Sequence, residues 1–185
     1  AVIDTNVIVS ALLSHYDDTA TVVIMRKIIR GEVIPLYNER ILEEYIEVLN
    51  RKKFSFTESM ISATLKVIID YGIILDSIES DISLPDPKDL VFYEVALSQE
   101  DSFLVTGNIK HFPKKPFIVT PTEMLAIMNE MKETNKRTLS ETLTCKDHYT
   151  HSVRRTLRYE FYGYILGSID SVRKCFIWKE SGFVL

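Results

Sequence analysis

Short apolar runs alternate along the chain with longer stretches in which apolar residues recur every three or four positions. The short runs are typical of buried strands in a parallel sheet and occupy residues 1–3, 33–37, 73–75, 102–105 and 117–119. The longer stretches have the apolar stripe of helices that pack on a core, and they predict helices over residues 7–12, 20–30, 39–51, 58–71, 91–97 and 121–131. This alternation is typical of an α/β protein whose parallel sheet is covered by helices on both faces.

Capping and breaking residues mark where several of these elements begin. Asn38 and Thr57 stand at helix N-cap positions, where their side chains can accept a hydrogen bond from a backbone N–H. The stretch Thr120–Glu123 combines a Thr cap, a first-turn proline and a Glu that can bond back to the cap. Pro35 has no backbone N–H to donate, so it indicates an edge position or an irregular strand for the second apolar run.

The chain changes character near residue 131, which predicts a domain over residues 1–131 and a C-terminal extension over residues 132–185. The first part has 12 lysines and arginines against 20 aspartates and glutamates, a net charge of −8, whereas the second has 10 against 6, a net charge of +4. Residues 132–151 are polar without a regular apolar period, and residues 153–185 are aromatic with two β-like stretches. A hairpin, a helix followed by a hairpin, or an arm exchanged with a partner all fit, and we expect an interaction or oligomerisation role.

Composition narrows the class of protein. Apolar residues make up 46% of the chain and charged residues 26%, so the chain can bury a core and is not a disordered segment. No apolar run approaches the about 18 residues of a transmembrane helix, so we expect no membrane partner. The two cysteines, Cys145 and Cys175, make no disulfide framework, which favours a reducing cytoplasm. The acidic charge of residues 1–131 argues against broad electrostatic capture of nucleic acid, but not against carboxylates that hold a cation.

Polar side chains with oxygen ligands recur where the predicted strands end and helices begin. Asp4 follows the first strand, Glu44 lies in the helix after the second, Asp86 and Asp89 flank a later helix start, and Asn108 follows the fourth strand. Asp4 alone would be interpreted as a helix N-cap, but the acids downstream favour a metal ligand. The carboxyl ends of parallel strands share one edge of a sheet, so these side chains can meet there. Clustered carboxylates need a cation, and hard oxygen ligands favour Mg²⁺ or Mn²⁺, which suits phosphodiester hydrolysis.

Four segments together resemble the PIN-domain family of metal-dependent ribonucleases, in particular its branch of toxins from toxin–antitoxin pairs. They are IDTNVIVSALLS, ILEEYIEVLNRKKF, DPKDLVFYEVAL, and LVTGNIKHFP with IVTPTEML, in family order over residues 1–130. The resemblance implies a three-layer α/β/α sandwich with a parallel sheet, and an endoribonuclease that depends on Mg²⁺ or Mn²⁺. It also implies an RNA substrate, a cognate antitoxin as partner, and a homodimer or higher homo-oligomer.

The resemblance also implies roles for individual residues. Asp4 matches the first acid of the family, Glu44 the acid of the helix after the second strand, and Asp89 the later helix-start acid, so these three are implied as catalytic residues and metal ligands. Many members have a fourth acid after Thr-Gly, where this chain has Asn108. Asparagine is a neutral oxygen ligand or a water anchor, and Asp86 is a candidate to replace the lost negative charge.

Four further residues complete the predicted site. Asn6 and Thr106 are candidates to hydrogen-bond the ligands, and Arg51 and Lys110 are candidates to contact RNA phosphates, although such basic residues are usually solvated loop charges. The asparagine in the fourth acidic position leaves a second hypothesis open. The chain would then be a PIN-fold module that binds RNA or protein with weakened catalysis.

Overall fold

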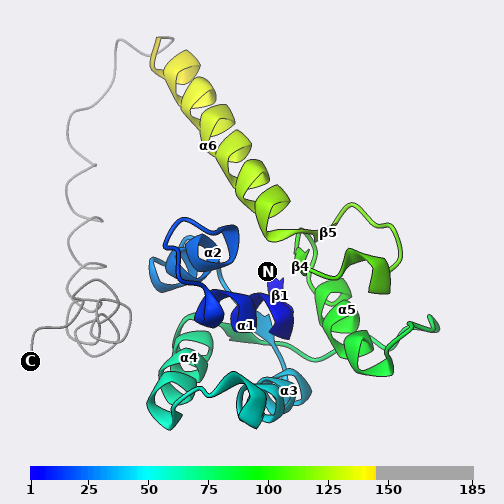
Figure 1. The fold of residues 1–185 in the computed structure, drawn as a ribbon. Coiled ribbons are helices and arrows are strands. Elements are labelled where there is room, and N and C mark those ends of the chain that lie inside the picture. The colour runs from blue at the N-terminus through cyan, green and yellow to red at the C-terminus, as the bar shows by residue number, and fades with distance from the viewer. Residues whose placement is uncertain (145–185) are drawn as a thin grey trace, which may run out of the picture. The chain divides into compact units, whose positions relative to one another are not determined.

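Strands and helices alternate along residues 1–144, the part of the chain that the structure, a computed structural model, describes (Figure 1). The strands there are β1 (Val2–Ile3), β2 (Leu36–Tyr37), β3 (Ile73–Ile74), β4 (Leu104–Val105) and β5 (Ile118–Val119). The α-helices are α1 (Thr5–Leu13), α2 (Ala20–Ile29), α3 (Glu39–Leu49), α4 (Glu58–Tyr71), α5 (Leu90–Leu97) and α6 (Pro121–Thr144). Short 3₁₀ helices in the connections are η1 (Lys52–Phe54), η2 (Pro87–Asp89) and η3 (Ile109–His111).

The paired strands of the described chain are all parallel. β4 pairs with β1 on one side and β5 on the other, with Leu104 opposite Val2, while β2 pairs with β3, with Leu36 opposite Ile73. The two groups of strands are joined, because the backbone N–H of Leu36 donates to the carbonyl of Ala1 at 2.9 Å. The spatial order is therefore β3-β2-β1-β4-β5, and the predicted α/β fold with a parallel sheet is confirmed.

The order of the strands reverses at β1, which places helices on both faces. From β1 the chain adds β2 and β3 on one side through α1 to α4, and α5 then returns it to the other side of β1 for β4 and β5. Right-handed crossovers in opposite directions put α1 to α4 on one face and α5 on the other, with the strands between them (Figure 1). The carboxyl ends of β1 and β4 lie at this reversal, where open α/β sheets bind ligands.

The central strands form the middle of a compact unit, Ala1–Asn129. All four residues of β1 and β4 have no exposed surface. Large apolar side chains from both helical layers cover them, and burial of each contributes about 1.5–3 kcal/mol. Those with less than 2% exposure on the helices include Ile8, Ile24, Met25, Ile28, Ile41, Tyr45, Leu49, Ile68 and Phe92. This rigid centre fixes the residues that directly follow β1 and β4.

The predicted helix starts are confirmed by their caps. The side-chain oxygens of Asn38 and Thr57 each accept a hydrogen bond from a backbone N–H three residues later, at 2.9 and 3.2 Å. Glu123 accepts the backbone N–H of Thr120 at 2.7 Å, and its own N–H donates to the Thr120 hydroxyl at 3.2 Å. This reciprocal pair is a capping box, and it starts α6.

Pro35 indicated an edge position or an irregular strand for the second apolar run, and the strand observed there, β2, comprises only the two residues that follow the proline. β2 begins after the proline and lies between β1 and β3, and Pro35 contributes only its carbonyl, which accepts the N–H of Ile73 at 2.8 Å. Gly72 permits this close approach of β3. A Cβ at this position would lie 2.4 Å from the carbonyl oxygen of Ile68 and 2.7 Å from the ring of Tyr37, so only glycine fits.

The last helix is longer than the sequence pattern predicted. α6 continues to Thr144, whereas the apolar period predicted a helix that ends near Met131 and left the structure of the following residues open. No glycine or proline interrupts residues 122–162, and most residues just after Met131 are adequate helix formers, so the helix continues without an apolar period. Over residues 1–144, no helix combines the length and apolar character that a membrane span requires. The arm and β-like stretches expected over residues 153–185 lie outside the described residues.

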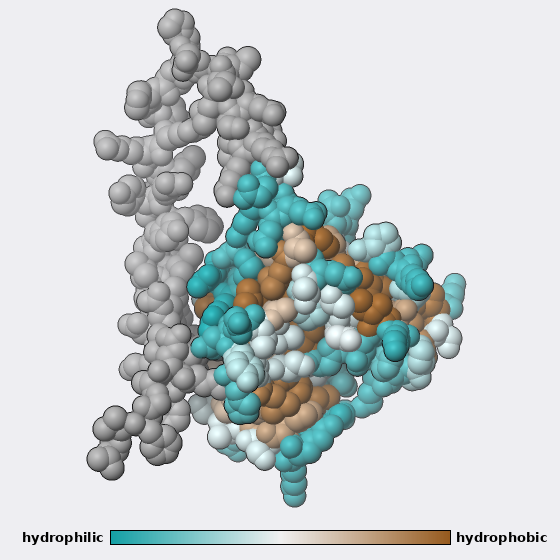
Figure 2. Space-filling model, turned by 45° about the horizontal axis from the view of Figure 1, so that its top comes forward, coloured by the Kyte–Doolittle hydropathy of each residue, from teal (hydrophilic) through white to brown (hydrophobic). Residues whose placement is uncertain are grey.

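Apolar side chains are exposed around the edge strand β3. Ile73 and Ile74 are 48% and 61% exposed, and Ile69 and Ile78 on either side are 49% and 53% exposed. On the face drawn in Figure 2, apolar surface forms separate patches among polar side chains. An open sheet edge with apolar side chains is a surface to which another chain can pair.

Candidate active site

Asp4 joins β1 to α1 at the point where the order of the strands reverses. Its backbone N–H donates to the carbonyl of Val105 at 2.9 Å, which fixes it against β4. The Oδ1 atom of Asp4 accepts the backbone N–H of Asn6 at 3.2 Å, so the aspartate is the N-cap of α1. Asp4 is only 5% exposed. Capping uses one carboxylate oxygen and leaves Oδ2 for contacts outside the helix.

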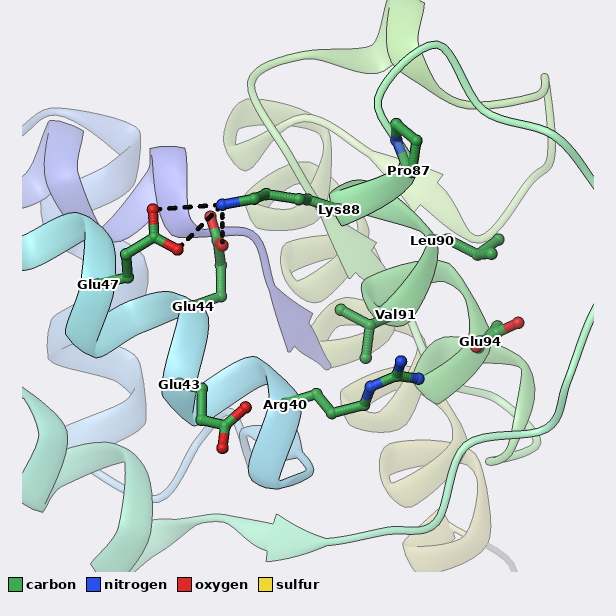
Figure 3. A pocket seen from close by; sticks show the side chains of 9 residues that line it. All are labelled: Arg40, Glu43, Glu44, Glu47, Pro87, Lys88, Leu90, Val91 and Glu94. Carbon is green, nitrogen blue, oxygen red and sulfur yellow. Dashed lines mark hydrogen bonds and ion pairs between the residues drawn. The ribbon is translucent and has the colours of Figure 1, made fainter.

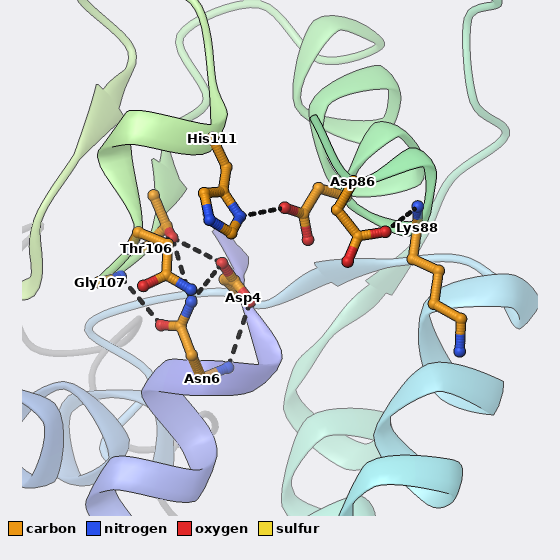
Figure 4. A network of polar contacts seen from close by, with 9 residues as sticks. Asp4, Asn6, Asp86, Lys88, Thr106, Gly107 and His111 are labelled. Atoms are coloured by element: carbon orange, nitrogen blue, oxygen red, sulfur yellow. Dashed lines mark hydrogen bonds and ion pairs between the residues drawn. The ribbon is translucent and has the colours of Figure 1, made fainter. Parts of the chain in front are cut away.

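A network of neutral hydrogen-bond donors holds that second oxygen (Figure 4). The Thr106 hydroxyl donates to Asp4 Oδ2 at 2.5 Å, and the side-chain amide of Asn6 donates to the same oxygen at 2.6 Å. The Asn6 carbonyl in turn accepts the N–H of Gly107 at 2.9 Å, and a Cβ at Gly107 would lie only 3.1 Å from that carbonyl oxygen. The structure therefore brings together Asp4, Asn6 and Thr106, which the sequence predicted as one ligand and its two supporting residues.

Asp4 is an acid in an environment that disfavours its charge. Burial raises the pKa of Asp4, while the hydrogen bonds from Thr106 and Asn6 lower it in part, and the nearby charge of Asp89 raises it further. The negative charge of Asp89 therefore acts on Asp4 and disfavours its ionisation. A cation bound by the two carboxylates would remove this repulsion and favour the ionised form of Asp4.

Asp89 is the last residue of η2, and its carboxylate lies beside the imidazole of His111, which belongs to η3. The Asp89 Oδ2 atom and the Nδ1 atom of His111 are 2.9 Å apart, which links η2 to η3 (Figure 4). Asp86, three residues earlier, is exposed, and its Oδ1 accepts the backbone N–H of Lys88 at 2.9 Å. Asp86 is thus the N-cap of η2.

Glu44 lies in a neighbouring cleft between α3 and the η2–α5 segment (Figure 3). The cleft has a volume of about 380 Å³. Lys88 reaches across it: its Nζ lies 2.9 and 3.2 Å from the two carboxylate oxygens of Glu47 and 3.8 Å from Glu44 Oε2. Arg51, four residues after Glu47 and just past the end of α3, forms an ion pair with Glu47 at 2.8 Å. The acids on this side are therefore accompanied by two cations of the same chain.

The charge of Glu44 is partly compensated by Lys88. Burial raises the pKa of Glu44, Lys88 acts in the opposite direction, and Glu47 raises it again. The exposed Glu47 differs, because its hydrogen bonds with Arg51 and Lys88 lower its pKa. Lys88 thus interacts with both acids, and it does so from the residue that precedes Asp89.

Among the described residues, no three His, Cys, Asp or Glu side chains converge closely enough to hold one metal ion. The residues nevertheless fit the Mg²⁺ or Mn²⁺ that the sequence predicted, because Mg²⁺ commonly takes one or two carboxylates and keeps several waters. Asp4 and Asp89 supply such a pair of hard oxygen ligands, and the repulsion between them would be relieved by a cation. Glu44 and Asp86 lie further along the same rim, where contact through water is the chemistry available to them.

The remaining predicted residues differ in what surrounds them. Asn108 is exposed and caps η3; its backbone N–H donates to Thr106 Oγ1 at 2.9 Å, so it supports the donor that holds Asp4. Arg51 is engaged by Glu47 and is therefore a weaker candidate for an RNA phosphate than the sequence suggested. Lys110, on η3, is exposed, and no ion pair with another described residue involves it.

Three further residues shape this site through contacts that the sequence did not predict. Lys88 stands inside the DPKD segment, but nothing local indicates that its ammonium reaches α3, 41 residues earlier. His111, which follows Lys110 in a basic stretch, pairs with Asp89. The buried Tyr45 donates its hydroxyl to the carbonyl of Ile3, and burial raises its pKa well above the usual range, so it anchors α3 to β1 as a neutral phenol. A polar tip on a buried aromatic residue beside Glu44 was the available signal.

Comparison with known proteins adds one finding. Residues 1–110, more than half of the chain, match the family model described as PIN domain. This range contains Asp4, Glu44, Asp89 and Asn108. No curated protein and no solved structure matched the chain.

Proposed function

Because the chain belongs to the PIN-domain family, we propose that it is an endoribonuclease that hydrolyses RNA phosphodiester bonds with Mg²⁺ or Mn²⁺. The observation that supports this best is the buried Asp4 carboxylate, fixed at the strand reversal by Thr106 and Asn6 and facing the charge of Asp89. Such a pair, with hard oxygen atoms and no counter-ion on Asp4, suits a divalent cation that binds phosphate oxygens.

In this proposal each residue of the chain has a defined task. Asp4 and Asp89 hold the divalent ion, which when bound supplies positive charge to the phosphate and lowers the pKa of a water. Thr106 and Asn6 keep Asp4 oriented, and their hydrogen bonds favour its ionised form. Glu44, in the neighbouring cleft, would add its negative charge to the site without contacting the ion directly. Asp86 and Asn108 line the rim and contact the ion through water, and Lys110 contacts the RNA phosphates.

The test is cleavage of a labelled RNA by the purified chain with Mn²⁺, with Mg²⁺ and with EDTA. We expect cleavage with either metal, none in EDTA, and none from an Asp4→Asn variant whose circular dichroism matches the wild type. Asp81→Asn, an exposed loop change away from these contacts, is the matched control and should cleave normally. Equal cleavage in EDTA would rule out this mechanism.

A second candidate function is a PIN-fold module that binds RNA or protein without cutting it. It is supported by the neutral Asn108 at the fourth acidic position and by the lack, in residues 1–144, of three side chains that converge on one metal ion. Titration calorimetry with Mn²⁺ separates the two functions. Saturable binding favours the nuclease, and no binding at millimolar Mn²⁺ favours the module.

The toxin role, the antitoxin partner and the homo-oligomer follow from the same resemblance, with action on RNA in the cytoplasm. The exposed apolar edge at β3 supports a protein partner, either an antitoxin or a second copy. Induced expression should arrest growth for the wild type and not for Asp4→Asn.

Light scattering should give the mass of a dimer or larger, and we expect deletion of residues 132–185 to lower that mass or to cause aggregation. A truncated chain with unchanged mass and melting temperature would contradict the proposed role of the extension.

A further inference from the structure

The acids on α3 are already balanced by cations of the same chain. Glu47 accepts two hydrogen bonds from Lys88 Nζ, at 2.9 and 3.2 Å, and one from Arg51 at 2.8 Å. Glu44 lies 3.8 Å from the same Lys88 ammonium. Glu44, Glu47, Lys88 and Arg51 therefore form one group whose formal charges cancel, and Figure 3 shows Lys88 reaching Glu44 and Glu47.

Asp4, at the carboxyl end of β1, and Asp89, at the end of η2, have no lysine or arginine partner among residues 1–144. Within these residues the carboxylate of Asp4 accepts hydrogen bonds only from neutral donors, the amide groups of Asn6 and the hydroxyl of Thr106. Asp89 has the imidazole of His111 as its near neighbour and acts on Asp4 through its charge. The unbalanced negative charge of the site is therefore concentrated at Asp4 and Asp89 rather than spread evenly over the four acids.

From this difference, and on the basis of the proposed function, we propose that Lys88 occupies the place of a second divalent ion and limits the site to one. An ion shared by Glu44 and Glu47 would need the space that the Lys88 ammonium fills, within 4 Å of both carboxylates. Two positive centres at that separation repel each other, and the ammonium and a divalent ion cannot fill the same space between the two carboxylates. Lys88 is thus a positioning residue, because it also ties η2, and with it Asp89, to α3.

The experiment counts bound Mn²⁺ per full-length chain by equilibrium dialysis, with electron paramagnetic resonance of the free ion as readout. We expect one ion in the wild type and two in Lys88→Met, because removal of the ammonium leaves Glu44 and Glu47 without their shared cation. Lys66→Met is the matched control, since Lys66 pairs with Asp70 within α4, and it should bind one ion. The double variant Lys88→Met with Glu47→Gln should return to one, because one of the two carboxylates is lost.

The outcomes separate this inference from the proposed function. Two ions in the wild type, or one ion in a folded Lys88→Met, would overturn the inference and leave metal-dependent cleavage standing. If Lys88→Met does not fold, the wild-type count still decides, because two ions there contradict the proposal. One ion in the wild type together with RNA cleavage that is insensitive to EDTA would overturn the proposed function alone.

Discussion

At the end of β1, Asp4 is buried and its oxygens accept hydrogen bonds from neutral groups, whereas on α3 the exposed Glu47 pairs with two cations. The two regions contain the same chemical group. They differ in burial and in partners: a lysine and an arginine contact the exposed Glu47, whereas the buried Asp4 is contacted by Asn6 of α1 and by Thr106, which follows β4. Burial raises the pKa of Asp4, while the paired cations lower the pKa of Glu47.

The comparison indicates where a cation would be most useful. An exposed carboxylate with two partners has its charge compensated already, and such surface pairs contribute little to stability. A buried carboxylate without a counter-ion is unfavourable until a cation arrives. We therefore expect metal-dependent properties to respond strongly to changes around Asp4 and Asp89 and weakly to changes on α3.

The largest expected effect contrasts the two sides directly. Asp89→Asn removes one of the two facing carboxylates, and we expect kcat/KM and Mn²⁺ affinity each to fall by more than about 100-fold, beyond the effect of losing a supporting residue. Glu44→Gln, on the balanced side, should lower both by about 10-fold or less. Calorimetry with Mn²⁺ and cleavage assays measure both variants, and equal losses would contradict the division of the site.

The next effect concerns the hydroxyl that holds Asp4. Thr106→Val keeps the shape but removes the donor to Asp4 Oδ2, so we expect a loss of about 10- to 100-fold in Mn²⁺ affinity. Thr64→Val is a matched control, because Thr64 is also buried but donates to a carbonyl within α4, at Met60. It should lower the melting temperature slightly and leave Mn²⁺ affinity unchanged. Equal metal affinity in both variants would show that Thr106 is merely structural.

The pH dependence of stability sharpens the same contrast. The folded pKa values of Asp4 and Glu44 lie above their ordinary values of 3.8 and 4.5. Between the ordinary and the raised pKa of each acid, the folded state therefore binds more protons than the unfolded state. Without metal, their contribution to the free energy of unfolding should therefore fall as pH rises from about 4 through the raised values. Asp4→Asn should flatten this dependence, and saturating Mn²⁺ should reverse it. Urea unfolding in EDTA from pH 4 to 7 measures the slope, and an unchanged slope in Asp4→Asn would contradict the assignment.

The smallest effect separates two basic residues in RNA binding. Lys110 is exposed and Arg51 is engaged by Glu47, so in the Asp4→Asn background Lys110→Ala should weaken RNA binding a few-fold and Arg51→Ala less. Loss of one phosphate contact should also reduce the slope of log affinity against log salt by about 0.7 for single-stranded RNA. A larger effect of Arg51→Ala would mean that RNA displaces Glu47 from the arginine.

The sequence by itself determined the local structure and the chemical class. Apolar spacing predicted the strands and all six α-helices of the described residues, and the side chains of Asn38, Thr57 and Thr120 capped the helices where they were expected to. The position of Asp4 after a buried strand and before a helix required only the pattern around it. These features depend on neighbours in sequence, because period and capping act over one or two turns.

The tertiary structure decided which side chains meet. Thr106 and Asp4 are 102 residues apart, and Lys88 and Glu47 are 41 apart. No local pattern therefore indicates which acid accepts a hydrogen bond from a neutral donor and which from a charged one. The same applies to β2, for which Pro35 suggested an edge position or an irregular strand: its pairing with β3 and its hydrogen bond to Ala1 join residues far apart in the sequence. Whether an acid is buried without a counter-ion or paired at the surface depends on the packing of separate elements, and that packing gave two chemically identical carboxylates different roles.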